Sequence, residues 1–485
     1  MNFSFKDVVN VFGICLLLSI LQLSRFLVID NTTKMSLSAQ QMQQDLDTLV
    51  AEVSQHSAFS ALDPRLLQNI ENRVNSLHYL YSLGIDSNRF HAEIAKLLAQ
   101  LNDPGINLSI SAYSTDQLPF SLKPMGKLWL ALDDSETPLD LEHPFVSHID
   151  GVPLSYWLKA ARKFISSSQQ EDLALTLAWL SRLDLLRAEM GLPLDETVSL
   201  TLFNDEESKK ELTLAIHSQA KLPYKELVIG SQDTDTNPIK IADLDELSTN
   251  RKLLSQLETA FENPLTILDL RQAKGYSDKL LTILTNEFSP SLPESTSPVF
   301  TLARYRRASN FKSDYLRADY LRPFNELNFF EQVQLSEIKV KLETQNSDSF
   351  SQLYARKNHP QADKTQHTNR LALMIGSQCR QECEWIAYLA KTWPKVTLIG
   401  EKTPGDLGKH YHFTLPNSKL NIALTSSLHY NPQGALISGV GTEPDITFTD
   451  SEPLHWQSLV TQLNNQASPE NSQQAPKSFV TAISN

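Results

Sequence analysis

The feature that most constrains this chain is a set of short apolar runs that alternate with helical patterns in its second half. The runs are PLTILDLR (264–271), RLALMIG (370–376) and KVTLIG (395–400), and helical patterns cover 277–288 and 382–393. Apolar runs this short, bounded by turn residues, are typical of strands buried on both faces. The alternation predicts an α/β fold built on a mostly parallel sheet that helices cover on both faces.

Three polar loops follow the carboxyl ends of these strands. They span 271–276, 377–384 and 400–413. Because the carboxyl ends of parallel strands meet at one edge of a sheet, functional residues collect there. The sequence therefore predicts that the three loops converge on one site.

The whole chain is too long for a single core, since one core rarely exceeds about 250–300 residues. Its 485 residues predict an α+β multidomain chain around the α/β core. In order, the predicted segments are 1–30, an apolar targeting segment; 31–60, a polar spacer; 61–110, a helical region; 111–222, a small β/α region; 223–450, the β-α-β core; and 465–485, a polar disordered tail.

The N-terminal segment has an apolar run at 11–21, interrupted by Ser19. The run is short for a membrane span and suits the core of a signal peptide, but no small-x-small cleavage site follows it. Cleavage and retention as a membrane anchor both stay open. Either outcome predicts an extracytoplasmic location in the cell envelope, with the membrane as a partner if the segment is retained.

The charge balance bears on partners. Fifty-six acidic side chains against 43 Lys and Arg give a net charge of −13, which repels a phosphate backbone. Nucleic acid is therefore not expected as a partner. One basic stretch, 303–322, interleaves aromatic residues, and we interpret it as a solvated or inter-domain helical face.

Two cysteines stand four positions apart in GSQCRQECEW (376–385), at the turn between a strand and a helix. They are Cys379 and Cys383, and the only other cysteine lies in the targeting segment. An oxidising compartment favours their pairing.

Several motifs recur together in one order. They are Asp-Leu-Arg at the end of 264–271, the helix start with Glu384, Gly-Glu-x-Thr-x-Gly at 400–405, a hairpin at 410–430 and GVGTEPDI at 439–446. This order resembles the catalytic core of the tail-specific, or C-terminal processing, serine peptidases. HIDGVP (148–153) resembles the Ile-Asp-Gly-x-Pro signature of the PDZ-like domain that precedes that core, so the resemblance implies a PDZ-like region at 111–222.

The resemblance implies a specific chemistry. A serine at a helix N-terminus attacks the peptide carbonyl, a lysine (in some branches His and Glu) takes its proton, and N–H groups of a glycine-rich loop hold the oxyanion. It implies polypeptide C-termini as the partner, with no cofactor and no metal. The residues given binding roles by the resemblance are Arg271, Gly275, Glu384, Gly400, Glu401 and Thr403.

This chain departs from the family pattern at each catalytic point. The nucleophile position, three residues before Glu384, is Gln381, and the lysine position, five residues after Glu401, is Asp406. The loop after Asp-Leu-Arg keeps one glycine, Gly275, and the stretch 102–105 (NDPG) lacks the histidine common in relatives. An amide cannot act as a nucleophile, so these losses predict a weak or inactive enzyme.

Displaced residues leave an active enzyme open as an alternative. Ser377 lies four residues before the nucleophile position, Lys409 three beyond the lysine position, and Cys379 could serve as a thiolate with His410 or His412. The cysteines and histidines also form a zinc-type ligand set, although their spacing matches no compact zinc motif. Some relatives carry cysteines flanking the serine, and this also favours a disulfide between Cys379 and Cys383.

Three functional classes therefore remain. The chain could be a serine-type envelope peptidase, a non-catalytic peptide-binding protein that uses 149–153 and the core sheet, or a purely structural protein. The combined loss at Gln381 and Asp406 favours a retired catalytic site that still binds peptides.

Overall fold

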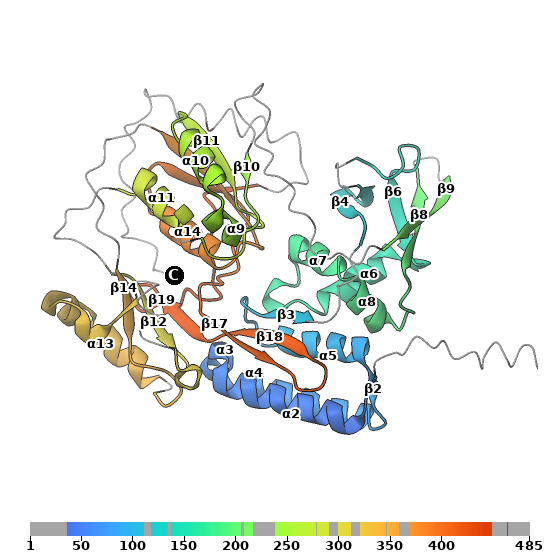
Figure 1. The fold of residues 1–485 in the computed structure, drawn as a ribbon, viewed down its shortest axis with the longest axis horizontal. Coiled ribbons are helices and arrows are strands. Elements are labelled where there is room, and N and C mark those ends of the chain that lie inside the picture. Colours follow the sequence, from blue (N-terminus) through green and yellow to red (C-terminus); the bar gives the residue numbers. More distant parts are fainter. Residues whose placement is uncertain are drawn as a thin grey trace, which may run out of the picture.

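The structure is a computed structural model in which a parallel core sheet, an antiparallel sheet, a layer of N-terminal helices and a separate strand-rich region lie side by side (Figure 1). It describes residues 36–110, 118–133, 137–204, 208–216, 238–277, 279–290, 299–311, 321–345, 347–357, 369–448 and 463. The predicted targeting segment, 1–30, and the predicted tail, 465–485, lie outside these residues. Within the described part, no helix is both long and apolar enough to cross a bilayer.

The core sheet is parallel, as the sequence predicts. Its strands, in spatial order, are β10 (Ile239–Lys240), β11 (Leu265–Asp269), β15 (Arg370–Ile375), β16 (Val396–Gly400) and β20 (Ile446–Thr447). Leu268 is in register with Leu373, and Leu373 with Leu398. The three apolar runs therefore lie next to one another, and their carboxyl ends share one edge.

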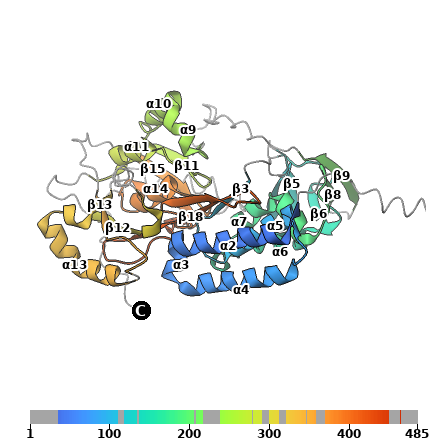
Figure 2. The ribbon, with the colours of Figure 1, turned by 60° about the horizontal axis from the view of Figure 1, so that its bottom comes forward.

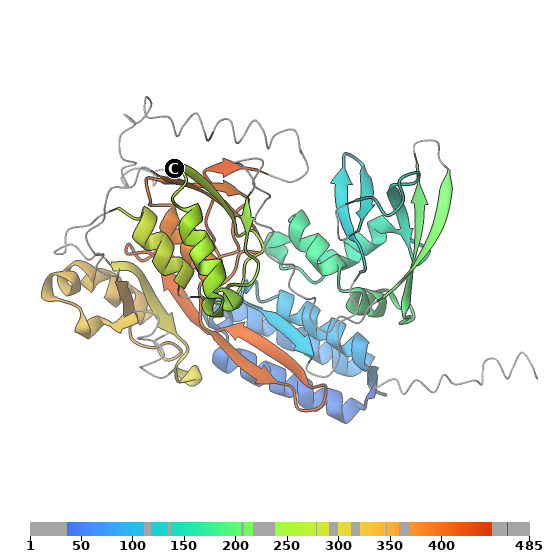
Figure 3. The same ribbon diagram turned by 45° about the horizontal axis from the view of Figure 1, so that its top comes forward.

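Among the described residues, helices cover one face of this sheet. They are α9 (Leu244–Thr249), α10 (Arg251–Ala260), α11 (Lys279–Phe288) and α14 (Glu382–Ala390), which share one core with Leu268 and Leu373 (Figure 3). The alternate side chains, such as Ile267 and Met374, form a smaller cluster with Ile399 and Leu463 on the other face. The expected helix layer on both faces is thus seen on one.

A second sheet is antiparallel. It runs β13 (Leu321–Pro323), β14 (Tyr354–Lys357), β12 (Val299–Tyr305) and β19 (Ser427–Tyr430), with α13 (Phe329–Thr344), η2 (Arg307–Ser309) and η3 (Phe324–Glu326) beside it. Strand β12 lies between two core strands in the chain but belongs here and not to the core sheet. Leu302, Leu335, Leu342 and Leu428 pack into its core.

The interpretation of 303–322 as a helical face is wrong for its described part. Residues 303–305 end β12, and Arg304 and Arg306 are buried. Arg306 donates from Nε to the carbonyl oxygen of Gln55 at 2.9 Å, at the end of an N-terminal helix. A buried guanidinium needs such acceptors, and carbonyls at a helix C-terminus supply them.

The predicted hairpin forms β17 (His410–Thr414) and β18 (Leu420–Thr425), joined through the turn at 416–418. A third strand, β3 (Asn107–Ile110), pairs with β18. The second half of the predicted hairpin is divided after β18, and its last part, β19, crosses to the antiparallel sheet. The hairpin therefore connects the helical layer to the parallel core sheet and to the antiparallel sheet that contains β19.

The predicted spacer at 31–60 is wrong where the structure describes it. Residues 39–56 form helix α2 (Ala39–His56), followed by α3 (Ala58–Leu62), α4 (Pro64–Leu80) and α5 (Ser87–Ala99), with a small ladder of β1 (Ser36–Leu37) and β2 (Ile85–Asp86). Figure 2 shows α2 and α4 lying side by side. Met42, Leu46, Leu49 and Val53 recur at helical spacing and are buried, so α2 is part of the core.

The small β/α region has an antiparallel sheet in the order β4 (Ser121–Met125), β5 (Leu128–Leu132), β6 (Phe145–Ile149), β8 (Thr197–Phe203) and β9 (Lys209–Ala215), with β7 (Val152–Pro153) beside β6. Its helices are α6 (Leu154–Arg162), η1 (Ser167–Gln169), α7 (Leu173–Leu180) and α8 (Leu183–Met190). Residues 173–190 thus form two helices, α7 and α8, and not one. The region shares its apolar core with the N-terminal helices, and its PDZ-like character stays a prediction.

Candidate functional site

The loops after β11, β15 and β16 meet at the start of α14, as the sequence predicts. Arg380 N–H donates to the carbonyl oxygen of Ala273 at 3.0 Å, which joins the first two loops. Gln381 N–H donates to the carbonyl oxygen of Asp406 at 3.1 Å, which joins the second and third. Gln381 therefore stands where all three loops converge.

The backbone at Gln381 is unusual for a residue with a side chain. Its φ of 59° and ψ of −114° lie outside the regions that side chains readily adopt. The side-chain oxygen Oε1 accepts a 2.6 Å hydrogen bond from Gly275 N–H. The next amide, Glu382 N–H, donates to the carbonyl oxygen of Gly275 at 3.3 Å.

An N–H donor of this kind can hold an oxyanion. A backbone amide that is fixed beside a helix N-terminus and aimed at one oxygen is the arrangement that stabilises developing negative charge. At Gly275 the acceptor is supplied by the chain itself, from Gln381. Gly275 also needs its glycine, since its φ is +95° and an added Cβ would lie 2.7 Å from a carboxylate oxygen of Asp245.

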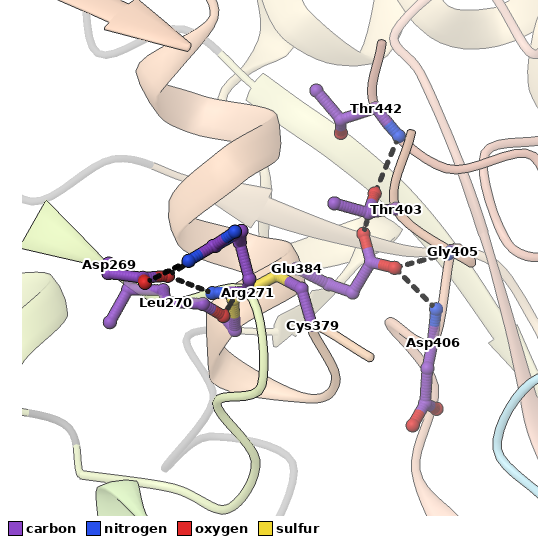
Figure 4. Close-up of a disulfide and its surroundings, with 10 residues drawn as sticks. Asp269, Leu270, Arg271, Cys379, Glu384, Thr403, Gly405, Asp406 and Thr442 are labelled. Carbon is purple, nitrogen blue, oxygen red and sulfur yellow. Dashed lines mark hydrogen bonds and ion pairs between the residues drawn. A yellow bond between two sulfur atoms is a disulfide. The ribbon is translucent and has the colours of Figure 1, made fainter. Parts of the chain in front are cut away.

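Glu384 fastens the third loop (Figure 4). Its carboxylate accepts from the Thr403 hydroxyl at 2.7 Å, from Asp406 N–H at 3.2 Å and from Gly405 N–H. The Thr403 hydroxyl oxygen in turn accepts from Thr442 N–H at 2.7 Å. Glu384 and Thr403, expected to bind peptide, are both buried and hold the loop backbone in place.

Burial also changes the ionisation of Glu384. Loss of solvent raises its pKa to about 7, and the nearby Asp406 adds to the rise, although the hydrogen bonds from Thr403 and Gly405 oppose it. A carboxyl group poised near neutrality is a common feature of functional sites. Here its oxygens are occupied by loop donors, which makes it a structural group.

Asp406 does not replace a lysine base. Its Oδ1 lies 2.8 Å from His410 Nε2, and both side chains are buried. Burial alone would lower the pKa of His410, but the charges of Asp406 and Asp103 outweigh it and raise this pKa above its usual value. Asp103 accepts from the Thr425 hydroxyl at 2.5 Å and from Gly105 N–H at 2.9 Å. The carboxylates of Asp406 and Asp103 therefore each have partners within the chain.

Gly105 is packed against this network. A Cβ added there would lie 2.6 Å from His410 Nε2 and 2.7 Å from Asp406 Oδ1, and nearer still to Thr425 Oγ1. The stretch 102–105, which lacks the expected histidine, thus leaves no room for any side chain at Gly105. His410 and Asp406 occupy the space beside it.

The remaining residues predicted to bind peptide support the backbone of the loops. Arg271 forms an ion pair with Asp269 at 2.7 Å and stays partly exposed. Gly400 has a φ of +120°, and an added Cβ would collide with the carbonyl oxygen of Ile375. Glu401 N–H donates to that same oxygen at 3.0 Å.

The displaced candidates lie in different surroundings. Ser377 is buried, and its hydroxyl donates to the carboxylate of Asp172 at 3.3 Å, at the start of α7. Lys409 is also buried, with its Nζ 5.5 Å from the ring centre of Tyr276 and its backbone N–H bonded to the Ser427 hydroxyl. Within the described part, Asp172 is the partner of the Ser377 hydroxyl, and a carboxylate is a poor base for a serine.

Cys379 and Cys383 are joined by a disulfide at the start of α14, and both are fully buried. A bonded pair offers no thiolate and no zinc ligand. His410 is bonded to Asp406, while His412 lies on the same strand with its ring centre 6.3 Å away. Over the residues that the structure describes, no three His, Cys, Asp or Glu side chains are grouped to hold a metal.

Sequence reasoning missed two residues of the site. Glu382, beside Gln381, accepts from Leu281 N–H at 3.1 Å and from Ser277 N–H, and so caps α11 from 105 residues away. No local pattern marks that contact. Asp103 was not among the predicted site residues, although an Asp-Pro-Gly turn beside a strand is a signal for a carboxylate that binds loop amides.

Comparisons with known proteins agree with the observed fold. The model of peptidase family S41 matches residues 238–448. A solved structure of a CPAF mutant has a TM-score of 0.62 at 14% identity, covering 90% of this chain and 99% of that one. Mature CPAF complexed with lactacystin gives a TM-score of 0.59 at 14% identity, with 88% and 99% covered. At these identities the likeness shows the fold. No curated protein matches.

Proposed function

Residues 238–448 belong to peptidase family S41, and from this premise we propose that the protein is a non-hydrolytic member that binds polypeptides near their C-termini. The family and fold make it a serine-type peptidase-like protein.

One observation carries the proposal: Gln381 Oε1 accepts the N–H of Gly275 at 2.6 Å. Gln381 stands at the helix start where the family resemblance places the nucleophile. A base cannot activate an amide side chain as a nucleophile by removing its proton. Its oxygen also occupies the donor that would otherwise hold a substrate oxyanion. Both the attack and the stabilisation of its intermediate are therefore lacking at this position.

The runner-up is a peptidase that uses a displaced nucleophile. Ser377 is bonded to Asp172, and Cys379 is bonded to Cys383, so neither stands beside an imidazole or ammonium group in the described part. Lys409, in the loop 400–413, has its Nζ 5.5 Å from the ring centre of Tyr276, in the loop 271–276. This arrangement favours binding over hydrolysis.

The proposed partner is an exported polypeptide with a free C-terminus, encountered in the cell envelope. The apolar run at 11–21 supports this location, and the paired cysteines suit an oxidising compartment. Family chemistry supports a polypeptide partner, and the net charge of −13 opposes nucleic acid.

The test is a binding measurement on the full-length chain. Fluorescent peptides with a free terminal carboxylate are titrated in parallel with the same peptides amidated at the C-terminus. The masses of the recovered peptides are then measured by mass spectrometry. The proposal predicts saturable binding that favours the free carboxylate and leaves the peptide intact. Equal failure of both peptide series to bind would reject the peptide-binding function and leave a structural role.

A further inference from the structure

One end of the N-terminal helical layer carries three exposed apolar side chains close together in the chain. They are Tyr79, Leu80 and Leu83, with exposed fractions of 87%, 60% and 100%. They lie at the end of α4 and in the turn that leads to β2 (Figure 1). We call this cluster the helical tip. Exposed apolar groups gathered in one place mark sites of interaction.

The helical tip is also where the described chain starts. Leu37 of β1 is in register with Ile85 of β2, and an added Cβ at Gly84 would lie 2.7 Å from the carbonyl oxygen of Leu37. The apolar run 11–21 is joined to this point by residues 22–35. Fourteen residues reach at most roughly 50 Å when extended, so the tip is tethered close to that run.

Both segments that build the tip lack charge. Residues 36–44 and 74–85 contain no Asp, Glu, Lys or Arg, although one residue in five is charged over the whole chain. Burial of a charge in a headgroup layer is costly, whereas leucine side chains gain from it and a tyrosine ring suits the boundary. A net charge of −13 would resist anionic lipid, and an uncharged contact avoids that repulsion where the chain meets the surface.

We propose that the helical tip docks on the lipid surface in which the N-terminal run 11–21 is embedded. This inference rests on the envelope location proposed above. Leu80 and Leu83 enter the headgroup layer, and Tyr79 lies at its boundary. The tip acts as a second membrane signal beside the N-terminal run and sets how the chain stands on the bilayer.

The test uses the full chain in vesicles of phosphatidylcholine. Cys15→Ala leaves the bonded pair Cys379 and Cys383 as the native cysteines, and Leu83→Cys then carries a nitroxide label. The control label is at Leu141→Cys, because Leu141 is 82% exposed but lies between β5 and β6. Relaxation by oxygen, which favours lipid, is compared with relaxation by a water-soluble nickel chelate.

The expected result is an oxygen-to-nickel ratio at Leu83→Cys that rises at least five-fold on vesicles, with no change at Leu141→Cys. Flotation separates the failures. If the chain floats with vesicles while both labels stay in water, the docking of the tip is overturned and the anchor stands. If the chain does not float, the proposed envelope attachment fails and the docking fails with it. Spin–spin broadening at Leu83→Cys without vesicles would assign the tip to a second copy of the chain and also overturn the proposal.

Discussion

At position 381 the backbone conformation and the side-chain hydrogen bond favour different residues. The backbone conformation, with φ at 59°, favours glycine, yet the side chain makes a bond to Gly275 that only a longer residue can reach. The family motif is enough to identify Gln381 as the residue at the nucleophile position. It does not predict the bond, because Gly275 is 106 residues away in the chain.

This conflict predicts an unusual order of stabilities for two variants. Gln381→Ala keeps the backbone strain and loses the hydrogen bond, which costs about 1–2 kcal/mol. Gln381→Gly loses the same bond but relieves the strain, so we expect it to be more stable than the alanine variant by about 1 kcal/mol. Urea unfolding of the three proteins measures the order, and an alanine variant as stable as the wild type would contradict it.

The raised pKa of Glu384 should make the free energy of unfolding depend on pH. Its raised pKa of about 7 means that the folded chain binds this proton more tightly than the unfolded chain does. The stability it contributes is therefore complete at low pH and is lost as the pH rises from about 4.5 through 7, by about 3 kcal/mol. Glu384→Gln removes the titration, so the difference in unfolding free energy between variant and wild type should change with pH over this range.

A matched variant separates this effect from a general change of charge. Glu337 lies exposed on α13, and Glu337→Gln removes the same charge from the surface of the protein. If the two variants show the same pH dependence relative to the wild type, the carboxyl group of Glu384 is not perturbed by burial as described.

At the scale of elements, the sequence was most informative where short strands are buried on both faces. Apolar runs at 264–271, 370–376 and 395–400 predicted β11, β15 and β16, because a buried parallel strand needs little else. The helix α2 was missed since five glutamines make 39–56 look polar, although its apolar residues keep helical spacing. The separation of β12 from the core sheet depends on tertiary pairing, which no local pattern shows.

The helix α2 also fixes the hairpin turn. Asp45, fully buried, accepts from Asn417 N–H at 2.8 Å and from Ser418 N–H at 2.7 Å. Asp45→Ala leaves both amides without an acceptor and should lower the unfolding free energy by about 2–4 kcal/mol. Asp47→Ala, an exposed change on the same helix, should change it by less than about 0.5 kcal/mol. Equal effects of the two variants in thermal unfolding would exclude the role given to Asp45.

The start of α14 is closed by the bond between Cys379 and Cys383. A loop of this length is expected to contribute about 2 kcal/mol by restricting the unfolded chain. The double variant Cys379→Ser and Cys383→Ser should unfold at correspondingly lower urea, and reductant should change the wild type alone. The intact mass without reductant should lack two hydrogens, and free thiols at both Cys379 and Cys383 under those conditions would contradict the pairing.

At the scale of the whole molecule, the candidate site is assembled from segments far apart in the chain. Gly275, Gln381 and Asp406 come from three loops, and Asp103, from the N-terminal region, accepts from Thr425 N–H in the adjoining hairpin. Motif order was sufficient to predict the core and the convergence of the loops. The pairing of Asp406 with His410 and the bonds of Asp103 to Thr425 could not be predicted, because they depend on how the hairpin and the 102–105 turn pack together.

The central claim is that this site does not cut the peptides that it binds. The most direct measurement is mass spectrometry of a denatured protein and of tail peptides after long incubation with the full-length chain, with Ser377→Ala and Gln381→Ala in parallel. We predict intact substrates in every sample. Cleavage by the wild type that either variant abolishes would contradict the claim and show that a working catalytic group stands in this site.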